Sequence, residues 1–153
     1  MKTVMILFVM IFTAALSAQE SKVPENVIRA FQVSHPKAQD VTWNVEGQNY
    51  EAHFTVHGNN NSVLIDTVGK ILETESEIDV ANLPSGVIKY LNDNYRGYTL
   101  AGTSKIVDDS GIVTYKAKMK DNNSNKIFDV MFTEDGKPLK PEGENDEAEG
   151  KEK

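Results

Sequence analysis

The chain has 153 residues, a formal net charge of −7 and no cysteine. The mild acidity gives no electrostatic support for binding nucleic acid or an anionic membrane surface, because both depend on clustered positive charge. Without cysteine there can be neither disulfide bonds nor a cysteine-linked lipid anchor, so the folded part is expected to depend on core packing.

Residues 1–18 have the pattern of a secretory signal peptide. Lys2 supplies a positive start, the stretch from Val4 to Leu16 is apolar almost throughout, and Ala18 ends a run of small residues before polar residues begin. The apolar stretch is too short and wrongly flanked for a membrane anchor. We therefore expect cleavage near Ala18, a periplasmic or secreted product, and no membrane insertion after cleavage.

The rest of the sequence contains two similar halves, at about 23–73 and 83–140. The matching segments are VPENVIRAF and LPSGVIKYL, YEAHF and YKAKM, and VGKIL and DGKPL, which begin at residues 23 and 83, 50 and 115, and 68 and 135. The connector at residues 75–82 is too short to separate two independent domains. We therefore expect a single domain over residues 19–140, made of two repeats.

Each half is predicted to begin with a helix. Pro24 and Pro84 occupy a first-turn position where a helix does not need a backbone N–H. Apolar side chains then recur at helical spacing, with Pro36 ending the first helix and Gly97 the second. These apolar side chains are Val27, Ile28 and Phe31 in the first half and Val87, Ile88 and Leu91 in the second.

Strands are predicted to follow each helix, because apolar and polar residues alternate between turn signals. The expected strands cover residues 41–46, 50–56, 62–67 and 70–73, and then 104–108, 115–120 and 126–133. A turn is expected at residues 59–61, and Asp135-Gly136 is a further hairpin signal. The pattern predicts an α+β fold with tandem α-β4 repeats, one curved antiparallel sheet of about eight strands, and two helices packed on one face.

The opposite face of that sheet is expected to be polar and open, and it carries the candidate partner-binding residues. These are Glu51, His53, Thr55 and His57 in the first half and Lys116, Lys118 and Lys120 in the second. Two interpretations stay open: the opposite charges are cross-strand partners, or they form the rim of a partner-binding surface. Trp43 shares a strand face with Val41 and Val45, so we expect it in the core.

The sequence predicts no catalytic, cofactor-binding or metal-binding residue, and we expect a protein that is not an enzyme. His53 and His57 are four residues apart on a predicted strand, roughly 13 Å, which is too far to share one metal ion. DNNSN from Asp121 lacks the glycine and glutamate that a calcium-binding EF-hand loop requires. No serine or threonine stands beside a histidine in an apolar setting, as a nucleophile would need.

Residues 141–153 form an acidic tail with six acidic residues, two lysines and little apolar side-chain surface. Such a segment cannot bury enough surface to offset the entropy lost on ordering, so we expect it to be disordered.

These patterns together resemble the PepSY-like group, also described as β-lactamase-inhibitor-like proteins, which bacteria export. The resemblance covers roughly residues 23–140 and is carried by VTW, GQNYEAHF, VGKIL, LPSGVIKYL, GIVTYKAKM and EDGKPL. It implies tandem α-β4 units that share one curved sheet, and a non-enzymatic binding or inhibitory role. The motifs describe turns and core positions, so no functional residue is carried over from the family.

Two hypotheses about function follow. The first is an exported binding protein that holds another protein on its open sheet face or edge loops, in its sharper form an inhibitor of a secreted or periplasmic enzyme. The second is a small-ligand or metal-ion binding or sensing protein of the cell envelope that uses Glu51, His53 and His57.

Overall fold

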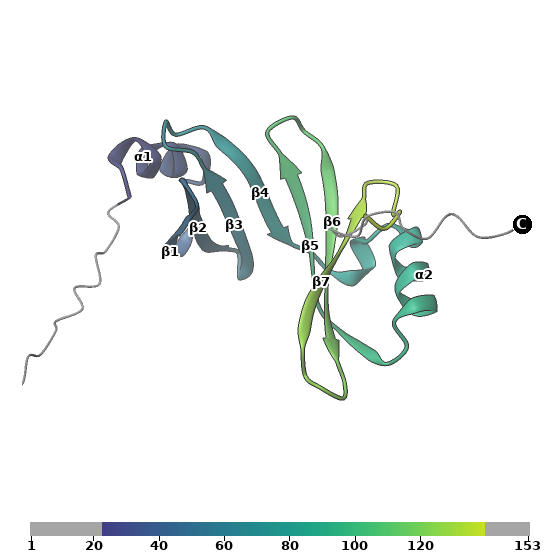
Figure 1. The fold of residues 1–153 in the computed structure, drawn as a ribbon. Coiled ribbons are helices and arrows are strands. Elements are labelled where there is room, and N and C mark those ends of the chain that lie inside the picture. The colour runs from purple at the N-terminus through teal and green to yellow at the C-terminus, as the bar shows by residue number, and fades with distance from the viewer. Residues whose placement is uncertain (1–22, 140–153) are drawn as a thin grey trace, which may run out of the picture.

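The computed structural model describes residues 23–139, so the predicted signal peptide and acidic tail lie outside the described residues. This part of the chain is an α+β fold in which seven strands form one antiparallel sheet in the order β1 to β7 (Figure 1). The elements are α1 (Glu25–Ser34), β1 (Gln39–Glu46), β2 (Asn49–Val56), β3 (Asn59–Ile65), β4 (Ile71–Glu77), the short 3-10 helix η1 (Val80–Asn82), α2 (Ser85–Asn94), β5 (Tyr98–Asp108), β6 (Val113–Asp121) and β7 (Ile127–Thr133).

The number of strands differs from the expected eight. Beyond β7, residues 23–139 contain only an isolated bridge between Phe132 and Pro138, and the Leu139 N–H donates to the Met131 carbonyl at 2.8 Å. Pro138 has no N–H to add to a ladder, which limits pairing at this edge. The hairpin expected at Asp135-Gly136 is present, but the strand after it is reduced to this bridge.

Three strand boundaries also differ from the prediction by three or more residues: the start of β3, the end of β4 and the start of β5. β4 runs on to Glu77 instead of ending at residue 73, and β5 already begins at Tyr98 instead of at residue 104. The expected connector at 75–82 is therefore partly strand. The turn expected at residues 59–61 lies earlier, at His57-Gly58, where both residues have positive φ.

The two helices begin directly after Pro24 and Pro84, as predicted. The last turn of α1 is closed by the N–H of His35, which donates to the Phe31 carbonyl at 2.8 Å. Tyr95 closes α2 in the same way on the carbonyl of Leu91, at 2.9 Å. Each helix buries two residues of its predicted apolar stripe: Val27 and Phe31 in α1, and Val87 and Leu91 in α2.

Each helix packs on its own part of the sheet, so the fold has two separate cores (Figure 1). In the first, α1 covers β2 and β3, and the buried residues are Val27, Phe31, Ala52, Phe54, Val63 and Ile65. In the second, α2 covers β6 and β7, and the buried residues are Leu83, Val87, Leu91, Ala117, Met119, Val130 and Phe132. The sheet is continuous between them through the pairing of β4 with β5.

A turn glycine contacts the first turn of the helix in both halves. A Cβ added to Gly69 would lie 3.3 Å from the carbonyl oxygen of Asn26, and one added to Gly136 would lie 3.1 Å from the backbone nitrogen of Val87. Both glycines have φ values in the left-handed region, +91° and +80°. The glycines of VGKIL and DGKPL therefore allow a hairpin to lie close to a helix in each half.

Trp43 packs partly in the first core, edge to face on Phe31 with ring centroids 5.3 Å apart. Its expected neighbours Val41 and Val45 are exposed, because β1 is the edge strand of the sheet and α1 covers the strands further in.

Candidate functional site

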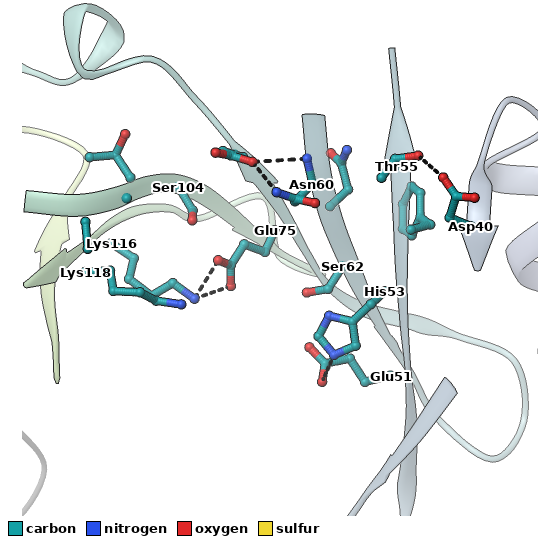
Figure 2. A pocket seen from close by; sticks show the side chains of 16 residues that line it. Asp40, Glu51, His53, Thr55, Asn60, Ser62, Glu75, Ser104, Lys116 and Lys118 are labelled. Atoms are coloured by element: carbon teal, nitrogen blue, oxygen red, sulfur yellow. Dashed lines mark hydrogen bonds and ion pairs between the residues drawn. The ribbon is translucent and has the colours of Figure 1, made fainter. Parts of the chain in front are cut away.

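The sheet face opposite the helices is polar and contains a hollow of about 540 Å³ (Figure 2). Strand alternation places Glu51, His53 and Thr55 on this face, because Ala52 and Phe54 between them point into the core. The polar residues that line the hollow come from the β1, β2, β3, β4, β5 and β6 strands: Asp40, Glu51, His53, Thr55, Asn60, Asn61, Ser62, Glu75, Glu77, Thr103, Ser104, Lys116 and Lys118.

A half-buried ion pair crosses the hollow. Lys116 on β6 places its Nζ 2.5 Å from each carboxylate oxygen of Glu75 on β4 (Figure 2). The side chains are only 18% and 22% exposed. The strand between them, β5, places the small Ser104 opposite Lys116, which leaves room for the lysine to reach across. The pair therefore links the two halves of the sheet.

The other carboxylates in the hollow also have partners. Glu51 Oε2 lies 3.0 Å from His53 Nε2, two residues along the same strand. Asp40 accepts a hydrogen bond from the Thr55 hydroxyl at 3.1 Å. Glu77 accepts two hydrogen bonds from Asn60, from the side-chain amide at 2.7 Å and from the backbone at 3.1 Å. These contacts hold the wall of the hollow in a defined arrangement.

Ser62 lies between the two charged pairs. It is paired in register with His53 on β2 and with Glu75 on β4, and it is only 8% exposed. Its side chain lines the hollow (Figure 2). The sequence analysis did not single out Ser62, because its neighbours become apparent only from the register of three strands.

Negative charge accumulates beside the hollow. Burial raises the pKa of the Glu73 carboxyl, and the nearby Glu75 raises it further, while Lys116 acts in the opposite direction. Glu51 and Asp108 add smaller contributions that also raise this pKa. Burial and three acidic neighbours therefore raise the pKa of Glu73, and Lys116 opposes them.

The structure brings together five of the seven predicted face residues. Those that line the hollow are Glu51, His53, Thr55, Lys116 and Lys118. His57 does not belong with them: it lies exposed in the turn after β2, with φ +53°. Lys120 lies on β6 beyond the residues that line the hollow. Lys116 pairs with Glu75 on β4 instead of with the acidic residue expected on the opposite half, Glu51, and the sequence analysis had placed Glu75 in the connector.

Two further properties concern residues 23–139 alone. This part of the chain contains no group of three or more histidine, aspartate or glutamate residues that could hold a metal ion. None of its helices has the length and apolarity that crossing a membrane requires.

No protein-family model matches the sequence, and no curated protein matches it significantly. Solved structures do share the fold. A DUF2874 family protein from Bacteroides uniformis is 17% identical with a TM-score of 0.69, over 78% of this chain and 88% of that chain. A candidate periplasmic protein from Bacteroides eggerthii is 15% identical with a TM-score of 0.70, over 78% and 87%. A BLIP-like protein from Bacteroides fragilis is 20% identical with a TM-score of 0.61, over 78% and 84%. The chain therefore has a BLIP-like fold.

Proposed function

We propose that the mature chain is an exported, non-enzymatic binding protein that holds a protein partner against its polar sheet face. The hollow in that face carries the proposal, because Glu51 is already paired with His53 and Glu75 with Lys116, so these side chains are fixed before a partner arrives. Preorganised polar groups lose little entropy on binding and favour one partner over others. The sharper form is an inhibitor of a secreted or periplasmic enzyme, and the BLIP-like neighbour supports it.

Membership of the PepSY-like group, the tandem repeat and export are part of the same proposal. The repeat is supported by matching burial at Val27 and Val87 and at Ala52 and Ala117, and by the two turn glycines against the helices. Export is supported by the apolar stretch in residues 1–18 and by the name of the Bacteroides eggerthii neighbour.

A hydrolytic role is less well supported by the same residues. Glu51, His53 and Ser62 are residue types that form nucleophile-base-acid triads, and they are neighbours on one face. A nucleophile and its base need to be within hydrogen-bond reach. In the described part of the chain, the partner of the His53 Nε2 atom is the Glu51 carboxylate at 3.0 Å, and no hydrogen bond joins His53 to Ser62.

A second candidate is a binding protein for a small polar ligand or metal ion. The observation that favours it is the volume of the hollow, about 540 Å³, which falls in the range of small-molecule sites. Isothermal titration calorimetry with divalent metal ions tests the ionic form: heat that disappears in His53→Ala supports it, and no heat rejects it.

The protein-binding proposal is tested by affinity capture from an envelope fraction of the native host, with the mature chain, residues 19–153, as bait. A face variant, Glu51→Lys with Lys118→Glu, reverses two charges in the hollow. A control variant, Glu25→Lys with Arg29→Glu, exchanges the charges of an exposed pair on α1. We expect the wild type and the control to retain the same protein and the face variant to lose it. Identical retention by all three baits, or none above background, contradicts the proposal.

A further inference from the structure

We infer that the open edge of strand β1, with the apolar groove beside it, binds an extended segment of another protein in which apolar and basic side chains alternate. The bound segment extends the sheet by one strand next to β1. The groove shares no lining residue with the polar hollow. The inference therefore goes beyond the proposed function and does not depend on it.

The two edges of the sheet differ in how the chain covers them. At the β7 edge, the Leu139 N–H donates to the Met131 carbonyl at 2.8 Å, and a bridge joins Phe132 to Pro138. At the β1 edge, no segment of residues 23–139 pairs with the outer side of the strand (Figure 1). The backbone N–H and C=O groups along such an edge are a template on which another chain can add a strand.

An apolar groove of about 430 Å³ lies between β1 and helix α1. Helix α1 lines it with Ile28, Phe31 and His35, and β1 lines it with Val41 and Trp43. Burial lowers the pKa of His35, so its ring is neutral at pH 7 and adds no charge to the groove. A strand added beside β1 places every second side chain on the same side of the sheet as Val41 and Trp43, toward α1. Apolar side chains at those positions fit the groove.

The charges on β1 favour a basic segment over a second copy of this chain. Asp40 and Glu46 are exposed, and the strand carries no basic residue. In the antiparallel register centred on Trp43, Asp40 of each copy would lie opposite Glu46 of the other. Like charges directly opposite destabilise a strand pair, whereas lysine or arginine at the same positions of another protein forms favourable pairs.

The inference is tested by NMR titration of the ¹⁵N-labelled mature chain with the peptide N-acetyl-Thr-Lys-Val-Thr-Ile-Lys-Thr amide. Two control peptides are a scrambled one, N-acetyl-Lys-Lys-Thr-Thr-Thr-Val-Ile amide, and the original with both lysines replaced by glutamate. We expect saturable shifts in β1 with the first peptide and weaker binding of both controls. Amide hydrogen exchange should also slow at alternate residues of β1, because only every second N–H points outward from an edge strand.

Variants locate the binding on the groove. Val41→Thr puts a hydroxyl in the groove without changing the side chain's shape, and it should weaken peptide binding about threefold to tenfold. Val33→Thr is the matched control, because Val33 is 77% exposed on α1 and does not line the groove. Glu46→Gln should weaken binding about twofold. The face variant, Glu51→Lys with Lys118→Glu, should bind the peptide as the wild type does.

Three outcomes would overturn the inference. One is no shift in β1, or equal binding of either control peptide. Another is binding without slower exchange at alternate β1 amides, which would exclude strand addition. The third is self-association of the chain through β1 that the peptide does not displace, which would identify a second copy as the occupant. None of these outcomes bears on capture of a partner by the polar face, so the two proposals can fail separately.

Discussion

Lys116 reaches over strand β5 to form a two-oxygen ion pair with Glu75 on β4, with both distances at 2.5 Å. The two residues belong to halves of the molecule whose buried cores are separate. The pair therefore joins the halves on the polar face, while the β4–β5 ladder joins them through the backbone. It also fixes two of the side chains that line the hollow.

Replacing the lysine should destabilise the fold. Lys116→Met leaves Glu75 half-buried without its cation, and we expect the free energy of unfolding to fall by about 1–2 kcal/mol. Urea unfolding followed by circular dichroism measures this change, and a double-mutant cycle with Glu75→Gln isolates the pair. Arg29→Gln is the control, because the side chains of Arg29 and Glu25 are 72% and 88% exposed. This pair should contribute less than about 0.5 kcal/mol to the free energy of unfolding. A coupling energy near zero between Lys116 and Glu75 would show that the pair does not link the halves.

The carboxyl group of Glu73 and its acidic neighbours should make stability depend on pH in a particular direction. Burial raises the pKa of Glu73, so the folded protein holds this proton more readily than the unfolded chain does. Stability from this group is therefore present at low pH and is lost as pH rises through the raised pKa. Glu73→Gln should be more stable than wild type at pH 7, and the difference should vanish below about pH 4, near the ordinary glutamate pKa. Unfolding midpoints of the wild type and of Glu73→Gln at pH 7 and below about pH 4 measure this difference in stability. A Glu73→Gln variant that is equally or less stable than the wild type at pH 7 refutes this account of Glu73.

Because the two cores are separate, we expect a core substitution in one half to destabilise mainly that half. Ile65 is fully buried in the first core, and Ile65→Ala should cost about 2–5 kcal/mol by opening a cavity. Amide hydrogen exchange should accelerate most in β2 and β3, and less in β6 and β7. Phe132→Leu, in the second core, is the reciprocal variant and should give the reverse pattern. Uniform acceleration across all seven strands would mean that the halves unfold as one unit.

The turn glycines provide a steric test. Gly136→Ala places a Cβ 3.1 Å from the Val87 nitrogen at a φ of +80°, so both strain and a clash with α2 are expected. Gly111 has nearly the same φ, +81°, but open space around it. We therefore expect Gly136→Ala to lower the free energy of unfolding by at least about 1 kcal/mol more than Gly111→Ala, in thermal or urea unfolding. Equal losses of unfolding free energy in the two variants would show that the turn at Gly136 is not packed tightly against α2.

The sequence predicted the structure best where buried residues recur at a regular spacing. Val27 with Phe31, and Val87 with Leu91, predicted both helices, since the spacing of buried residues in a helix is visible locally. Strand β4 was underpredicted because ILETESE has polar residues on both faces in its second half. It is held by ladders to β3 and β5, which no local pattern reveals.

The site was predicted only in part for the same reason. Alternation assigned Glu51, His53 and Thr55 to the polar face correctly, because Ala52 and Phe54 are buried. Ser62 and Glu75 enter the site through the register between β2, β3 and β4. Lys116 reaches Glu75 only because β5 lies between their strands and places a serine there. Register and strand order are properties of the assembled sheet.

The central claim, that the polar sheet face binds a protein partner, is tested most directly by site-specific photo-cross-linking in the native host. A photoreactive amino acid is placed at Ser104 in the hollow, or at Glu25 on α1 as the control. The account predicts a discrete cross-linked adduct from position 104 that is absent from position 25 and disappears when Glu51→Lys and Lys118→Glu are added. An adduct from position 25 with none from position 104 would contradict it.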